Sequence, residues 1–129
     1  MKPDQMFLNG LFSIIQIDRV ESSNKLSGQI RLNPAHAIFK GHFPGNPILP
    51  GVCIVQIIKE ILMCHLGNKL ILNCAVSIKY LSFINPEKYG LISFNMELAE
   101  TGNDIIFCDV SLNFESVVLG RFKGDFKVI

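Results

Sequence analysis

Apolar and polar residues alternate along much of the chain, with the period of two that is typical of a half-buried β-strand. The alternation is clearest over 26–32, 91–99 and 106–115, where every second residue is apolar. Three further segments are long and rich in apolar residues. The sequence therefore predicts six strands, over 11–20, 26–32, 70–84, 91–99, 106–115 and 117–129. They follow a loosely ordered lead-in over 1–10.

The segment from Gly51 to Leu66 has a different pattern and predicts the long helix of the molecule. Its residues are apolar almost all round, and Gly67 and Asn68 provide a good C-terminal stop. A helix that is apolar on every side is expected to be buried on every side. In a chain otherwise made of strands, this means that a sheet wraps around it.

Details within the strands follow from the same pattern. The strand 70–84 is expected to present one apolar face, formed by Leu72, Cys74, Val76, Ile78 and Tyr80. Gly120 and Gly124 are expected to be bulges in the last strand. Two strands, a helix and four strands in this order predict an α+β class, and 129 residues suit one domain over 1–129.

A loop rich in proline and glycine joins the second strand to the helix. Three prolines and three glycines fall between Gly41 and Gly51, so the backbone is expected to be stiff and sharply turned. Pro50 suits a first helical turn. The N–H groups of Gly51 and Val52 would then point out of the helix start, where they form a site for an oxyanion or a polarised carbonyl. The loop also carries His42, a candidate catalytic base.

The run G-H-F-P-G-N-P-I-L-P-G-V, from Gly41 to Val52, resembles the signature of the hotdog-fold (3R)-hydroxyacyl-acyl-carrier-protein dehydratases. The resemblance implies an antiparallel sheet curled around one central helix. It also implies that His42 is the base and that Gly51 contacts the thioester carbonyl, with Phe43, Pro50 and Val52 beside the substrate. Members of that family form dimers in which the His loop of one subunit faces the helix of the other, so a homodimer or higher oligomer is expected.

The chain departs from this family at one position. The family has a catalytic Glu or Asp fourteen residues after the His, and here that position is Gln56. An amide cannot give up a proton as a carboxylic acid does. The nearest carboxylate is Glu60, one helical turn further on and on the same face. Losing a positioned general acid typically costs about 10²–10⁴ in rate.

Four hypotheses follow from this departure. The first is a working dehydratase in which Glu60, a water held by Gln56, or a second use of His42 supplies the proton. The second is a hetero-oligomer whose acid comes from a homologous subunit. The third is a thioesterase, and the fourth is a module that binds an acyl chain without turning it over. The His in its complete loop favours the first two, and we place the dehydratase first. The substrate would be an acyl thioester on acyl carrier protein or coenzyme A.

Composition narrows the remaining possibilities. Hydrophobic residues make up 49% of the chain and charged residues 18%, which favours an oligomer. The net charge is +1 without a basic run, so neither nucleic acid nor an anionic membrane is an expected partner. The sequence has no secretory signal, and we expect a cytoplasmic protein. The four cysteines are expected to be reduced and buried, with no metal and no cofactor.

Several residues receive structural interpretations. Glu60 beside Lys59 is interpreted as a solvated or interface carboxylate, and His65 as a residue favoured by the helix dipole. His36 is interpreted as a loop residue near the site. Phe39 and Phe43 are expected in the core, and Tyr80 and Phe83 are given no role.

Overall fold

The computed structural model describes residues 10–20 and 22–129, so the predicted lead-in falls almost entirely outside the described residues. The elements are β1 (Phe12–Arg19), β2 (Lys25–Leu32), α1 (Ile38–Gly41), α2 (Gly51–Leu66), β3 (Leu70–Tyr80), β4 (Leu91–Glu100), β5 (Ile105–Phe114) and β6 (Val117–Val128). Among the described residues, no helix combines the length and the apolar character needed to cross a bilayer.

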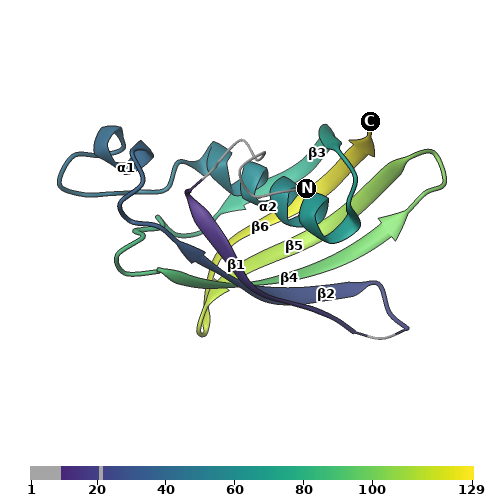
Figure 1. Cartoon of the computed structure of the whole chain (residues 1–129), viewed down its shortest axis with the longest axis horizontal. Helices are drawn as coiled ribbons and strands as arrows, with labels where there is room; N and C mark the ends of the chain where they lie inside the picture. Colours follow the sequence, from purple (N-terminus) through teal and green to yellow (C-terminus); the bar gives the residue numbers. More distant parts are fainter. Residues whose placement is uncertain (1–9, 21) are drawn as a thin grey trace.

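The six strands form one curved antiparallel sheet in the order β1-β2-β4-β5-β6-β3, and α2 lies in its concave face (Figure 1). Alternate residues of β4 and β5 point toward the helix and are buried, while their neighbours lie on the other face. The core forms between these residues and one side of α2, represented by Ile57, Ile58 and Ile61. The arrangement confirms the predicted α+β hotdog fold.

The predicted bounds of α2 are confirmed, but the expectation that it is buried on every side is wrong. Gly67 ends the helix in the left-handed conformation, with φ of 76°, and its N–H donates to the Met63 carbonyl. One sheet covers only one side of a helix. The opposite side is only partly covered: Val52 is 75% exposed there, and Val55 and Lys59 are half-buried.

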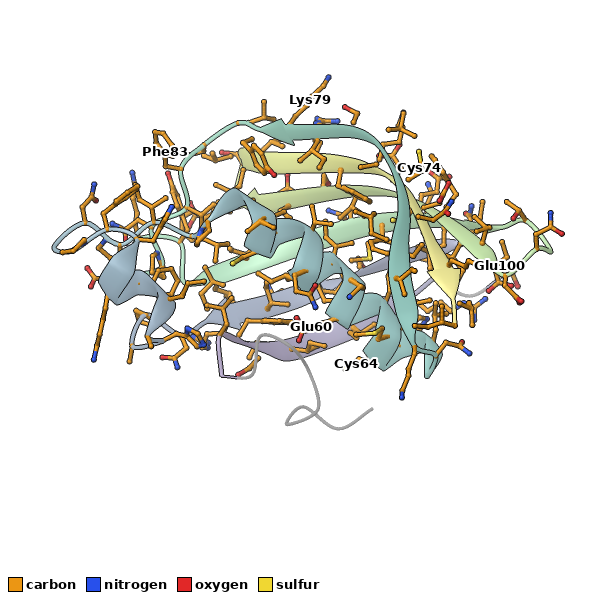
Figure 2. The ribbon with its side chains drawn as sticks, turned by 90° about the horizontal axis from the view of Figure 1, so that it is seen from above. Glu60, Cys64, Cys74, Lys79, Phe83 and Glu100 are labelled. Carbon is orange, nitrogen blue, oxygen red and sulfur yellow. The ribbon has the colours of Figure 1, made fainter. Side chains whose placement is uncertain are left out.

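The strand predicted over 70–84 is shorter, since β3 ends at Tyr80. Two register shifts place an extra residue on β3, at Asn73 and at Val76. Each shift reverses the alternation, so the expected single apolar face is wrong. Leu72 and Ile78 pair with the inward-facing Phe126 and Phe122, whereas Cys74 pairs with Asp125 and points away from α2 (Figure 2).

Of the two bulges expected in β6, one lies next to Gly120 and none lies at Gly124. Gly120 lies beside the register shift between β5 and β6, where Leu112 pairs with Gly120 and Asn113 with Val118. Gly124 is not a bulge, because it pairs in register with Ala75 of β3. A side chain at Gly124 would collide with the backbone carbonyl of Cys74, so glycine is required there by the close approach of β3.

The loop before α2 contains a short helix, α1, that the sequence pattern did not predict. Phe39 anchors α1 in the core, and its expected burial is confirmed, whereas Phe43 is 50% exposed and its expected burial is wrong. Beyond α1 the chain makes the turns that carry His42 and then enters α2 (Figure 1). The loop is thus fixed at both ends.

Candidate active site

His42 follows α1 directly and is half-buried. Its Nδ1 lies 3.1 Å from the backbone carbonyl oxygen of Ile48. A carbonyl oxygen only accepts hydrogen bonds, so the neutral ring carries its proton on Nδ1 and donates it to Ile48. Nε2 then holds the lone pair, which is the state that a general base requires.

Short-range hydrogen bonds hold the loop around His42. The N–H of Ile48 donates to the His42 carbonyl at 2.8 Å, and Phe43 and Asn46 exchange two further backbone hydrogen bonds. The ring of Phe43 stacks on the imidazole, with centroids 4.2 Å apart, and the peptide bond between these two residues is cis. The imidazole is therefore fixed by its own loop.

The start of α2 provides the second group. Pro50 occupies the N-cap position, with φ of −59° and ψ of 139°, and its carbonyl accepts from the N–H of Cys53 at 2.9 Å. Helix geometry leaves the N–H groups of Gly51 and Val52 without an intrahelical acceptor. These donors can polarise a carbonyl oxygen placed at the helix start.

A groove of about 360 Å³ runs between the partly covered side of α2 and the edge strand β3. Its lining is mostly apolar, as an acyl chain requires. The lining residues are Val52, Cys53, Val55, Gln56, Lys59, Leu72, Ile78, Tyr80 and Phe126. None of them is a carboxylate. The groove therefore presents the side-chain amide of Gln56 and no carboxylic acid.

Tyr80 closes the groove at the start of α2. A Cβ atom added at Gly51 would lie 2.8 Å from Cζ and 3.1 Å from Oη of Tyr80. The ring thus occupies the space that a side chain at position 51 would need. The sequence pattern predicted no role for this residue. The available signal was its inward position on β3, which the two bulges obscured.

Glu60 lies apart from the groove although it is one turn from Gln56. It is 0% exposed, so the expectation of a solvated carboxylate is wrong. Figure 2 shows it on the side of α2 turned away from β3.

Burial, together with the Glu60 carboxylate, raises the pKa of the Cys53 thiol and that of the Cys64 thiol. Cys53 is therefore neutral near pH 7.

The predicted site residues fall into two groups in one chain. Gln56 and Val52 line the groove, and Gly51 contacts Tyr80 beside it. His42, Phe43 and Pro50 are not among the residues that line the groove. Phe43 lines a separate shallow depression with α1. Within one chain, His42 therefore does not line the groove that reaches the start of α2.

The cysteines only partly match expectation. All four are free, but Cys74 is exposed and Cys64 is half-buried, because the bulges of β3 turn Cys74 outward and Cys64 lies on a flank of α2. Within residues 10–20 and 22–129 no group of three or more His, Cys, Asp or Glu side chains could hold a metal ion.

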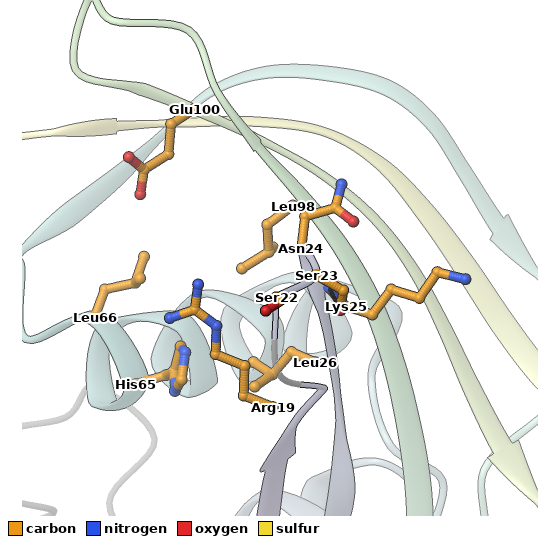
Figure 3. Close-up of a pocket in the computed structure, with 10 residues that line it drawn as sticks. All are labelled: Arg19, Ser22, Ser23, Asn24, Lys25, Leu26, His65, Leu66, Leu98 and Glu100. Carbon is orange, nitrogen blue, oxygen red and sulfur yellow. Dashed lines mark hydrogen bonds between the residues drawn. The ribbon is translucent and has the colours of Figure 1, made fainter.

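A second hollow, of about 600 Å³, lies at the other end of α2 and contains none of the predicted site residues. Figure 3 shows Arg19 beside His65 there, with Glu100 across the opening. His65 lies in the last turn of α2, as its interpretation as a dipole-favoured residue requires. Because polar and apolar groups line this hollow about equally, whereas the lining of the groove is mostly apolar, we regard the groove as the better candidate for an acyl chain.

Comparisons with known proteins identify relatives by sequence and by fold. A curated relative, the 3-hydroxyacyl-[acyl-carrier-protein] dehydratase FabZ of Wolbachia pipientis wMel, is 36% identical over 86 residues, which are 66% of this chain and 52% of the relative. The chain thus spans about half the length of the curated relatives it matches.

Two solved structures have the same fold. A chain of the dehydratase heterocomplex ApeI:P from Xenorhabdus doucetiae has a TM-score of 0.72 at 17% identity, covering 89% of this chain and 96% of that one. A point mutant of the fluoroacetyl-CoA-specific thioesterase FlK has a TM-score of 0.64 at 11% identity, covering 87% and 90%. The ApeI-like family model, described as ApeI dehydratase, matches residues 18–113. The chain therefore belongs to the ApeI-like dehydratase family.

Proposed function

We propose that this protein dehydrates a 3-hydroxyacyl thioester, carried by acyl carrier protein or coenzyme A, in acyl-chain biosynthesis in the cytoplasm. The main support is the hydrogen bond from Nδ1 of His42 to the Ile48 carbonyl, which leaves Nε2 free to accept a proton. The family match and the FabZ relatives support the same reaction class.

The proposed reaction begins at the carbon next to the carbonyl. Nε2 of His42 takes a proton from this carbon, while the N–H of Gly51 stabilises the negative charge that forms on the carbonyl oxygen. The electron pair then forms the carbon–carbon double bond and expels the 3-hydroxyl, which must gain a proton to leave as water. Gln56 lies beside the path of this hydroxyl but can only hydrogen-bond to it or to a water.

The proton for the leaving group has two proposed sources. Glu60 is not one of them, because it is completely buried and does not line the groove. A water held by Gln56 is one source. The other is an acid from a homologous subunit, a possibility supported by the heterocomplex formed by the related ApeI:P dehydratase.

We propose that the working unit is at least a dimer. In one chain His42 lies outside the groove, so a neighbouring subunit would have to bring its own His42 to it. The edge strand β3 and the segment after it expose large apolar side chains that such a neighbour would cover. They are Ile71, Val76, Leu81 and Phe83.

A thioesterase is the second candidate function. The fold likeness to FlK and the absence of a carboxylate from the groove lining favour it, since hydrolysis needs water at the carbonyl rather than an acid for a leaving hydroxyl. The two reactions differ in their products. Dehydration gives an enoyl thioester, whereas hydrolysis releases the free thiol.

The test compares wild type with His42→Ala, using His65→Ala in the last turn of α2 as the matched control. Short and long 3-hydroxyacyl thioesters are supplied, and enoyl absorbance and free thiol are measured in parallel. We expect enoyl formation that His42→Ala reduces by about 10²-fold or more and that His65→Ala leaves unchanged. Thiol release in place of enoyl formation would establish the thioesterase, and full enoyl turnover by His42→Ala would refute the mechanism.

A further inference from the structure

Tyr80 is the last residue of β3, and its position is set by the sheet. It pairs with Gly120 of β6, which has no side chain to compete for the space on that face. Its ring is directed toward the start of α2, where it covers Gly51. In the single chain the Tyr80 side chain remains 55% exposed, so its hydroxyl is accessible from the groove.

The hydroxyl of Tyr80 lies close to the free N–H groups of the helix. A Cβ at position 51 would be 3.1 Å from Oη. In an α-helix the Cβ bond tilts toward the N-terminus, which is also the direction of the free N–H groups. The phenol and the first N–H groups of α2 therefore border the same small volume at the end of the groove.

We propose that the Tyr80 hydroxyl donates a hydrogen bond to the thioester carbonyl oxygen, alongside the Gly51 N–H. This inference rests on the dehydration proposed above. When Nε2 of His42 takes the proton, the electron pair of the C–H bond moves into the carbonyl and leaves an enolate oxygen. Two donors aimed at that oxygen stabilise it better than one. The pair then returns to form the double bond as hydroxide leaves with a proton.

The other protic side chains of the groove are less suited to this role. Lys59 is eight residues beyond Gly51, which is about 12 Å along the helix axis. Cys53 is nearer, but a thiol is a weak hydrogen-bond donor. Gln56 is more than one turn from the helix start and lies where the 3-hydroxyl would be. The three heavy atoms nearest to a Cβ at position 51 all belong to Tyr80.

The chain offers a matched pair of variants, because it contains two tyrosines. Tyr80→Phe removes the hydroxyl and keeps the ring over Gly51. Tyr89→Phe makes the same change where the ring packs edge-on against Phe114, outside the groove. We expect Tyr80→Phe to lower kcat by about 10²-fold with KM changed by less than about threefold. Tyr89→Phe should change neither.

A second measurement reads the hydrogen bond itself. An enoyl thioester labelled with carbon-13 at the carbonyl is bound to the oligomeric protein, and its carbonyl stretch is recorded by infrared difference spectroscopy. Hydrogen bonding polarises the carbonyl and lowers this frequency. We expect the bound frequency to rise in Tyr80→Phe and to stay at the wild-type value in Tyr89→Phe, as a purely structural role for Tyr80 would not predict.

The two measurements separate this inference from the proposed function. Unchanged kcat and frequency in Tyr80→Phe, with turnover still dependent on His42, would overturn the role of Tyr80 and leave the dehydratase intact. A wild type that binds the enoyl thioester without turnover, and whose carbonyl frequency still depends on Tyr80, would overturn the dehydratase and support the contact. A wild type that binds no acyl thioester would overturn both.

Discussion

Gln56 has almost the volume of a glutamate but differs in the proton it can supply. Its side chain lines the apolar groove, one helical turn beyond Val52. A carboxylic acid in such surroundings is held partly protonated, because burial disfavours its charged form. The amide cannot take part in this equilibrium at any pH. A glutamate at position 56 could therefore give a proton to a leaving group in the groove, whereas Gln56 cannot.

Gln56→Glu is expected to increase the rate of enoyl formation by about tenfold or more, since it introduces a general acid at nearly constant volume. Absorbance of the enoyl thioester measures the rate. Glu60→Gln is the companion change. Because Glu60 is buried outside the groove, we expect it to leave the turnover of the folded protein within about threefold of wild type. Turnover abolished by Glu60→Gln and restored by adding Gln56→Glu would instead identify Glu60 as the acid.

Cys108 provides a pH dependence that is independent of catalysis. Burial, with smaller contributions from Asp109 and Asp125, raises its pKa from 9.0 to about 12. The unfolded chain loses this proton above about pH 9 while the folded chain keeps it, so the contribution to stability is complete below pH 9 and is lost as the pH rises toward 12.

Denaturant unfolding at about pH 8 and about pH 10 tests this prediction. Cys108 should account for a loss of about 1.4 kcal/mol of unfolding free energy per pH unit within the window. Cys108→Ala should remove that part of the pH dependence. Cys74→Ala, at an exposed site on β3, should retain the wild-type dependence. Equal slopes for Cys108→Ala and wild type would contradict the assignment.

Only part of the candidate site could be predicted from the sequence. His42 and Gly51 could be predicted because a fixed spacing of Pro and Gly specifies the loop and the helix start. Tyr80 was missed, since its approach to Gly51 depends on strand pairing far along the chain. The predicted environment of Glu60 was also wrong. A carboxylate beside a lysine is usually solvated, and only the packing around α2 determines its burial.

At the scale of elements, the contact between β3 and β6 restricts the choice of residues most strongly. Gly124 lets the backbone of β3 approach so closely that a methyl group would meet the Cys74 carbonyl. Backbone cannot move aside as a flexible side chain can. The lining of the groove on β3, including Ile78 and Tyr80, therefore depends on a glycine in the neighbouring strand.

Gly124→Ala is expected to reduce the unfolding free energy by about 1–3 kcal/mol, because the added methyl pushes β3 away from β6. Gly41→Ala is the matched control, since a Cβ at that position meets no atom within 4 Å. It should change stability by less than about 0.5 kcal/mol. Thermal or denaturant unfolding compares the two variants, and equal effects would show that the close approach is not limiting.

The alternation of apolar and polar residues predicted the bounds of β4 and β5 to within about a residue or two. Each of these strands has one buried face and contains no extra, unpaired residue. The same rule placed the end of β3 four residues too late and gave it one continuous face. Bulges at Asn73 and Val76 have no signature in β3 itself, since they arise from its register against β6. The incomplete cover of α2 could not be predicted either, because apolar residues on a helix can pack against a sheet of the same chain or against a second subunit.

At the scale of the whole molecule, the apolar edge predicts assembly. Val76 is 62% exposed and Phe83 81% exposed in the single chain. We expect light scattering at micromolar concentration to give at least a dimer. Val76→Glu should shift the population toward monomer by placing a charge in the interface. Val117→Glu, at an exposed valine in β6, is the control and should preserve the wild-type mass; a stable wild-type monomer would remove the shared-site proposal.

The two bulges of β3 also bear on how the protein stays dispersed at high concentration. An outer strand with a straight row of free N–H and C=O groups is a template on which fibrils grow. In β3 the row is interrupted at Asn73 and again at Val76, so an extended peptide cannot follow it over more than a few residues. Only a surface shaped to the same irregular edge fits along its full length. The irregularity therefore protects against amyloid-like stacking while it admits a matching subunit.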